Sequence, residues 1–248
     1  MVSWERDQVT RLSGAGGERT MRVITTTTAL LFALQASAQA GYMSEYTDAA
    51  GDIATGNGNL DIVSAMVSHT DSSLTISMTV ADLNADWGKY MVLIDTGILG
   101  GDDSNPWGRD ISLGEGIDID FGLGAWLDGG GGTTGLMTWD SMGGWGLAYD
   151  VEQSIDWDND TVSWTIDGAF LDQYINSSEG YGGFEFDIVS TGGGDNDPAI
   201  DIMGGEGTQG GWESGSTMTD MFTYNLPAPG ALALLGLAGL AGRRRRRH

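Results

Sequence analysis

The chain has 248 residues, 41 glycines, no cysteine and a formal net charge of −24. The lack of cysteine excludes disulfide bonds and thiol chemistry. The acidic residues exclude nucleic acid and anionic lipid surfaces as partners of the part of the chain between its two ends, because both would repel it.

The N-terminal part predicts an export signal behind a polar leader. Residues 1–20 are polar and without pattern, and we expect the true start at Met21. Residues 21–40 begin with Met21 and the basic Arg22, continue with an apolar run and end in the small-x-small motif at Ala38 and Ala40. This order is typical of a secretory signal peptide that is cleaved after Ala40.

Residues 41–226 form the predicted exported domain. It holds only two basic residues, Lys89 and Arg109, against 32 acidic ones, which gives a formal net charge of −30. The domain is long enough to bury an apolar core. Because its acidic groups repel one another, we expect it to need high salt or bound cations.

Alternating apolar and polar residues dominate this domain and predict β-strands. The expected segments, in chain order, are 62–67, 74–80, 90–94, 117–121, a hairpin over 153–166, then 184–188 and 221–224. The first two form a hairpin with one buried face, whereas 90–94 is apolar on both faces, as in a central strand. The predicted fold is all-β, an antiparallel β-sandwich of about eight or nine strands, with one short helix at 168–174.

Three acidic loops offer the hard oxygen ligands that calcium prefers. The preferred loop follows the predicted central strand, and the others lie at 156–160 and 195–197. The candidate ligands in the preferred loop are Asp95, Asp102, Asp103 and Asn105. Aspartates are also common turn formers and solubilising charges, and that alternative stays open.

Several tryptophans stand beside glycines in predicted loops. They are Trp107, Trp139, Trp145 and Trp212. An exposed indole face can stack on a sugar ring, so these residues form a candidate sugar platform. Packing over one end of the sandwich is the alternative. Trp164 alternates with apolar neighbours and is expected in the core.

No catalytic residue is expected. His69 lies in a predicted turn, where we expect it to be solvated, and His248 lies in the C-terminal tail. No serine stands in a nucleophile-elbow motif. A glycosidase needs only two suitably spaced carboxylates, and among 32 acidic residues the sequence neither supports nor excludes such a pair.

The C-terminal residues 227–248 combine three elements. Pro227, Pro229 and Gly230 prevent a strand or helix from continuing. The apolar segment 230–242 follows, roughly 20 Å long as a helix, against a hydrocarbon core of about 30 Å. The chain then closes with a basic block that stays cytoplasmic: Arg243, Arg244, Arg245, Arg246 and Arg247. A segment this short is a poor permanent anchor and suits a temporary one.

This tail resembles the PEP-CTERM sorting signal, which the exosortase family of membrane proteases recognises in bacteria. The usual Pro-Glu-Pro core reads Pro227-Ala228-Pro229 here. The resemblance implies an exosortase-type partner and contact with the membrane only through the tail. It also implies an inner-membrane-anchored intermediate that ends at the cell surface or in the extracellular matrix, where extracellular polysaccharide is a second expected partner.

The order of elements over residues 46–188 resembles the DOMON-like superfamily, which includes the family-nine carbohydrate-binding modules. The resemblance rests on the opening at 47–52, the hairpin over 60–80, and strand 90–96 with its Gly/Asp loop and Trp107. It implies a non-enzymatic β-sandwich.

The sequence therefore predicts a non-enzymatic surface protein. The alternatives are a carbohydrate-binding module, with or without calcium, and a secreted glycoside hydrolase.

Overall fold

The structure is a computed structural model that describes residues 42–70, 72–127, 135–168, 183–204, 211–212 and 214–225. Three predicted features lie outside these residues: the export signal with its cleavage motif, the sorting tail from Pro227 onward, and the predicted helix beyond Gly168. Among the described residues, no helix is long and apolar enough to cross a membrane.

The described residues form fourteen β-strands. In chain order they are β1 (Tyr42–Thr47), β2 (Ile62–Thr70), β3 (Ser73–Val80), β4 (Lys89–Asp95), β5 (Ile111–Leu113), β6 (Phe121–Trp126), β7 (Gly135–Asp140), β8 (Gly144–Asp150), β9 (Glu152–Asp156), β10 (Thr161–Asp167), β11 (Gly183–Thr191), β12 (Ala199–Ile202), β13 (Ser216–Met218) and β14 (Phe222–Asn225). The predicted all-β class is confirmed, but the predicted number of strands is too low. Some of the additional strands, such as three-residue β5 and β13, are too short to show an alternating pattern.

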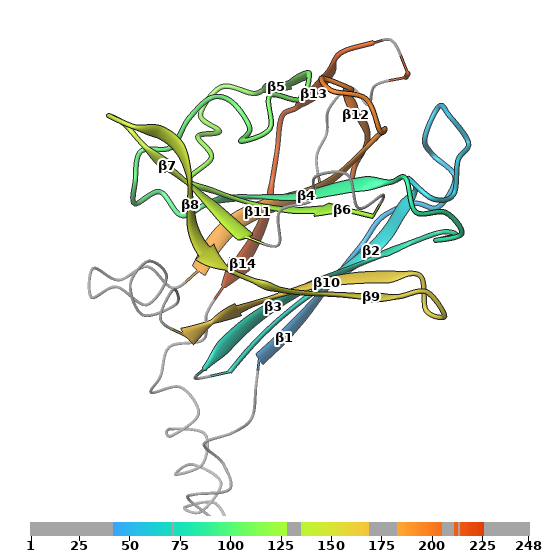
Figure 1. Ribbon diagram of the computed structural model, residues 1–248, viewed down its shortest axis with the longest axis horizontal. Coiled ribbons are helices and arrows are strands. Elements are labelled where there is room, and N and C mark those ends of the chain that lie inside the picture. The colour runs from blue at the N-terminus through green and yellow to red at the C-terminus, as the bar shows by residue number, and fades with distance from the viewer. Residues whose placement is uncertain are drawn as a thin grey trace, which may run out of the picture. The chain divides into compact units, whose positions relative to one another are not determined.

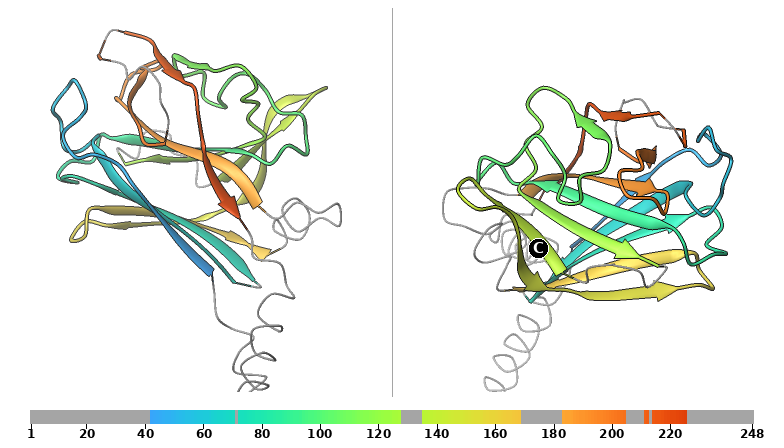
Figure 2. Two further views of the ribbon diagram at one scale, coloured as in Figure 1. Left: turned by 180° about the vertical axis from the view of Figure 1, so that it is seen from behind. Right: turned by 45° about the horizontal axis from the view of Figure 1, so that its top comes forward.

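Two sheets lie one above the other (Figure 1). The five-stranded sheet has the order β1-β2-β3-β10-β9, and the seven-stranded sheet has the order β12-β11-β4-β6-β7-β8, with β14 also paired to β11. All pairs in these sheets are antiparallel, whereas β5 and β13 form a separate parallel pair above the seven-stranded sheet. Figure 2 shows the same layers from two further sides. The arrangement is consistent with the predicted β-sandwich.

The main apolar core lies between the two sheets. In β3, Leu74, Ile76 and Met78 are fully buried, because alternate residues of a strand face the same side. Trp164 of β10 is buried as predicted, and its Nε1 donates a 3.2 Å hydrogen bond to the carbonyl of Gly124 in β6. That bond connects the two sheets through the core.

The predicted central strand is confirmed as β4, which lies between β11 and β6. Val92 faces the main core, whereas Met91 and Leu93 face a second apolar cluster on the opposite side of the sheet. Ile111 and Met218, from the covering strands β5 and β13, belong to this second cluster. Both faces of β4 are therefore buried, which explains its uninterrupted apolar sequence.

The strand predicted at 117–121 is largely wrong. β6 begins only at Phe121, and Asp120 is completely buried instead of facing solvent. The Asp120 carboxylate accepts hydrogen bonds from the backbone N of Thr96 at 2.8 Å and of Gly101 at 3.0 Å. The buried carboxylate therefore fixes the loop after β4, because it accepts hydrogen bonds from backbone N–H groups that no strand pairs with.

The prediction of a solvated turn at His69 is also wrong. β2 continues to Thr70, so His69 lies within the strand, and its Nδ1 is 2.6 Å from the hydroxyl of Tyr224 in β14. Its ring stacks on Tyr42, with 5.0 Å between the ring centroids. His69 thus connects a strand of each sheet.

Candidate metal centre

Three aspartates from separate segments bring their carboxylates together. One carboxylate oxygen from each of Asp52, Asp61 and Asp201 lies within 4.8 Å of the other two, and we call these residues the aspartate triad. Asp52 is exposed in the loop after β1, Asp61 is buried just before β2, and Asp201 is fully buried in β12. It is the one cluster of this kind within the described part of the chain.

Hydrogen bonds hold the start of β2 against the seven-stranded sheet. The backbone N of Ile62 donates to Asp201 Oδ2 at 2.6 Å. The Ser190 hydroxyl donates to the carbonyl of Leu60, also at 2.6 Å. Because Ile62 belongs to the five-stranded sheet and Asp201 to the seven-stranded sheet, the triad lies at a junction between the two sheets.

The loop between β1 and β2 folds back onto Asp61. Gly51 and Gly56 have φ angles of 80° and 62°, a left-handed conformation that glycine adopts without strain. The backbone N of Gly51 donates to Asp61 Oδ2 at 2.7 Å. This bond places the next residue, Asp52, beside Asp61 and completes the triad.

The triad concentrates negative charge at a buried place. Burial, with smaller contributions from the neighbouring aspartates, raises the pKa of Asp201 to about 8. Burial also raises the pKa of Asp61, and it raises that of the nearby Asp48 to about 6. Carboxylates crowded in this way either keep a proton or are compensated by a cation.

The same loop contains buried oxygens without hydrogen-bond partners. Within the described residues, Asp61 Oδ1 and Asp48 Oδ2 have none, and neither has the Thr55 hydroxyl. The Asn59 side chain, 1% exposed, leaves both its amide oxygen and nitrogen unpaired. Buried polar atoms are normally hydrogen-bonded. Carboxylate, amide and hydroxyl oxygens of this kind are the ligands that a hard cation takes.

A further buried carboxyl group lies in β11. Asp187 is completely buried, and its Oδ1 accepts hydrogen bonds from the backbone N of Ile188 at 2.7 Å and of Gly204 at 2.8 Å. Its Oδ2 is buried without a partner in the described part of the chain. Burial, aided by the charges of Asp48 and Asp220, raises the pKa of Asp187 to about 8.

The calcium ligands predicted from the sequence lie elsewhere and bond mainly to their own loop. Asp95 Oδ1 accepts from the backbone N of Gly97 at 2.6 Å, and the Ser104 hydroxyl donates to Asp102. Asn105 Oδ1 accepts from the backbone N of Arg109 at 3.0 Å, while Asp103 is exposed. These four residues are not part of the triad, and calcium binding by them remains a prediction.

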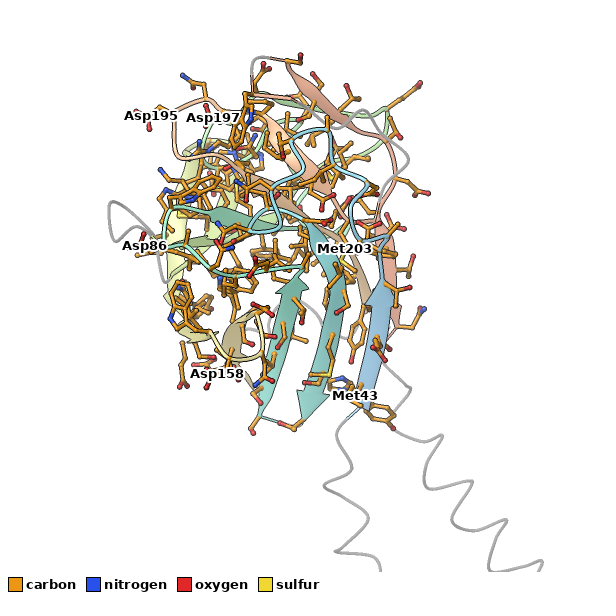
Figure 3. The ribbon with its side chains drawn as sticks, turned by 90° about the vertical axis from the view of Figure 1, so that its right-hand side faces the viewer. Met43, Asp86, Asp158, Asp195, Asp197 and Met203 are labelled. Atoms are coloured by element: carbon orange, nitrogen blue, oxygen red, sulfur yellow. The ribbon has the colours of Figure 1, made fainter. Side chains whose placement is uncertain are left out.

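The other two acidic clusters are separate turns. Figure 3 shows Asp195 and Asp197 together in one loop and Asp158 well away from both. Asp156 Oδ1 accepts from the backbone N of Asp158 at 3.1 Å, and Asp197 Oδ2 accepts from that of Gly194 at 2.8 Å. The aspartates act here as turn formers, which was the alternative to calcium binding.

The four predicted platform tryptophans fall into three aromatic pairs. The pairs are Trp107 with Trp126, Trp139 with Trp145, and Trp87 with Trp212, with ring centroids 5.1, 5.6 and 6.0 Å apart. Trp107 and Trp145 both pack against the second apolar cluster, and Trp139 is the cross-strand neighbour of Trp145. Three of the four therefore share the outer face of the seven-stranded sheet, and half-exposed Trp212 belongs to another pair.

Glycines make room for this outer aromatic face. A Cβ atom on Gly124 would lie 2.7 Å from Trp126 and 2.8 Å from Trp107, and one on Gly122 would lie 3.2 Å from Trp107. The indole of Trp107 therefore lies directly on the backbone of β6. Leu147, on β8 at the end of the same sheet, is 61% exposed. Part of this apolar face is consequently accessible to a ligand.

A shallow open depression of about 390 Å³ lies at the edge of β4 and β11. Asp95 and Glu185 both line it and are cross-strand partners. Burial raises the pKa of Asp95, and the charges of Asp120 and Glu185 raise it further. Two neighbouring carboxyl groups satisfy one requirement of a paired-carboxylate hydrolase.

Sequence reasoning missed the triad, although a signal for two of its members was present. Asp61 stands between Leu60 and Ile62, and Asp201 stands between two isoleucines. An acidic residue with apolar neighbours on both sides, at the start of a strand or within one, is often buried and then needs a partner.

Comparison with protein-family models gives no match, and comparison with curated proteins gives none either. The function of the chain therefore has to be argued from its own residues.

Proposed function

We propose that this protein is an exported, non-enzymatic surface protein that an exosortase-type membrane protease sorts through its C-terminal tail. The observation that carries the proposal is the order of the tail: Pro227-Ala228-Pro229-Gly230, a short apolar segment, and five arginines. An N-terminal segment with the pattern of a secretory signal supports it, because a sorting tail has a use only on an exported chain.

The extent of the folded domain also supports the proposal. The first described strand begins at Tyr42, directly after the expected cleavage site behind Ala40, and the last ends at Asn225, just before Pro227. Removing both signals would therefore leave every described strand intact. The remaining domain has a formal net charge of −30, which keeps it soluble and repels anionic lipid surfaces.

The proposed route has three steps. The signal directs the chain through the inner membrane, the tail holds it there as an anchored intermediate, and cleavage transfers it to the cell surface or extracellular matrix. The basic block stops translocation because each charge costs about 2.5–3.5 kcal/mol at the centre of a membrane helix.

Mass spectrometry of the mature protein's two ends tests this proposal in a bacterial host with an exosortase. The expected mature chain begins near Gly41 and ends near Leu226. Replacing both Pro227 and Pro229 with alanine should leave the tail attached, while an Ala228→Ser control should be processed normally. Intact tail peptides in the mature, surface-exposed pool would refute the sorting proposal.

Binding of extracellular polysaccharide is a second candidate function, favoured by the outer aromatic face. Trp139 and Trp145 form a tilted aromatic pair at its edge, and the exposed Leu147 lies on the same strand as Trp145. If they bind sugar rings, alanine at either position should abolish retardation of the protein in gels containing the host's polysaccharide. Trp212→Ala, in a different aromatic pair, should retain it. Equal retardation of all these variants would exclude a platform at this face.

A further inference from the structure

We propose that Asp52, Asp61 and Asp201 form a calcium site that holds the loop between β1 and β2 against β12. The inference is independent of the sorting proposal, because it depends only on the described domain. It also places calcium at residues other than the Asp95–Asn105 loop favoured by the sequence.

The close approach of three carboxylates is the first observation. One oxygen from each lies within 4.8 Å of the other two. A single calcium ion with ligand distances of 2.3–2.6 Å can bind three oxygens at such separations. Without a cation, these like charges would repel one another across a partly buried space.

The second observation is independent of the clustering. Asp61 is only 5% exposed, yet its Oδ1 is buried without a hydrogen-bond partner within the described residues, while its Oδ2 accepts from Gly51. A buried carboxylate oxygen without a hydrogen-bond donor destabilises the folded state, because it has lost its hydrogen bonds to water and forms none within the protein. A metal ion provides that oxygen with a partner while Gly51 keeps the other oxygen in place.

The chemistry of the donors selects calcium. All three ligands are carboxylates, and the cluster contains no cysteine or histidine, so softer metals lack their preferred ligands. Two of the carboxylates, on Asp61 and Asp201, are buried, so a bound ion must give up part of its water shell there. Magnesium does this reluctantly, whereas calcium accepts irregular oxygen sets on flexible loops. Exposed Asp52 leaves a side open for water ligands and for entry of the ion.

The position of the site gives it a structural role. Asp61 precedes β2 in the five-stranded sheet, and Asp201 lies in β12 of the seven-stranded sheet. A shared ion would therefore fasten the two sheets and the β1–β2 loop at one point. Calcium sites of extracellular modules have Kd values of about 10⁻⁴–10⁻³ M, so the site would fill after export.

Titration of the full chain, first stripped with EDTA, tests the proposal. At pH 7.5 and constant ionic strength, calorimetry with calcium chloride should show one site with a Kd of about 10⁻⁴–10⁻³ M. At ten times the Kd, Tm should rise by about 3–6 °C, from mass action on a domain of this size. An equal rise with magnesium chloride at the same concentration would overturn the assignment to calcium, as would no response to calcium.

Single substitutions locate the site. Asp61→Asn and Asp201→Asn should each weaken calcium binding at least tenfold, while the control Asp102→Asn should bind like the wild type. If the buried variants fail to fold, Asp52→Asn replaces them, because Asp52 is exposed and its substitution removes the negative charge of one ligand without disturbing the core. Unchanged calcium affinity in Asp52→Asn, or loss of affinity in Asp102→Asn alone, would overturn the proposal.

Discussion

Replacing Asp187 with asparagine should make the stability of the domain less dependent on pH. The carboxyl group is completely buried, its Oδ1 accepts two backbone hydrogen bonds, and its Oδ2 has no partner in the described part of the chain. An asparagine Oδ1 can accept the same two bonds from Ile188 and Gly204. The substitution thus keeps the shape of the side chain and removes its ionisation.

The magnitude follows from the pKa of Asp187, which burial raises from 3.8 to about 8. Between these values the unfolded chain loses the proton and the folded domain keeps it. The stability contributed by protonated Asp187 is therefore fully present below about pH 4 and is lost as the pH rises toward 8. The loss is about 1.4 kcal/mol per pH unit, so the stability of the variant relative to the wild type should increase by roughly 4 kcal/mol between pH 4 and pH 7.

Urea unfolding, followed by tryptophan fluorescence at pH 4.5, 6 and 7.5 in EDTA, measures this effect. The difference in unfolding free energy between Asp187→Asn and the wild type should increase with pH, because only the wild type titrates at this position. Asp158→Asn, at an exposed turn, controls for the loss of one negative charge. A difference in unfolding free energy that does not change with pH would show that Asp187 is ionised in the folded domain.

Two further substitutions test the sandwich edge and the tail. A Cβ atom on Gly183 would lie 1.9 Å from the backbone oxygen of Tyr224. Gly183→Ala should therefore displace β14 and lower the free energy of unfolding, measured in urea, by about 1–3 kcal/mol. The control Gly146→Ala, with open space around it, should change that free energy by less than about 0.5 kcal/mol. Equal stabilities would mean that β14 is not fixed against β11. Replacing arginines 243–247 with serine should remove the barrier to translocation, so that the chain escapes as unprocessed soluble protein. Normal cleavage of that variant at the membrane would show that the arginines are dispensable.

The strands that could be predicted are those with a regular burial pattern, either alternating along the strand or buried at nearly every position. β3 alternates one buried and one polar face, and β4 is buried on both faces, so each has a distinct sequence pattern. The order of strands in the sheets could not be predicted, because β10 pairs with β3 across more than 80 residues of intervening chain. Nothing local in the sequence specifies such a pairing.

Irregular positions account for the main errors. Alternation places Ile62 on the face opposite Ala65 and Val67, yet all three are buried in the main core. A register shift between Ile62 and Ser64 turns the strand, so Ile62 reaches the same side as the others. The burial of Asp120 could not be predicted from alternation either. It depends on backbone N–H donors in a loop whose sequence has no periodic pattern.

The aspartate triad depends on contacts within one loop and on the pairing of distant strands. Asp52 and Asp61 lie in one loop, but Asp201 reaches them only because β12 follows β11 in the seven-stranded sheet and lies against the start of β2. The sequence favoured the Asp95–Asn105 loop instead, since that loop follows the predicted central strand. Turn-forming hydrogen bonds use much of that acceptor capacity locally.

The positions of the two basic residues of the domain affect its resistance to proteases. Lys89 and Arg109 are each only 6% exposed, and their side chains donate to the backbone carbonyls of Gly193 and Gly194. Proteases that cut after lysine or arginine need an accessible, extended segment at the scissile bond. Between residues 41 and 226 such enzymes would find only these two sites, both held inside the fold. Trypsin-like enzymes should therefore leave the folded domain uncut.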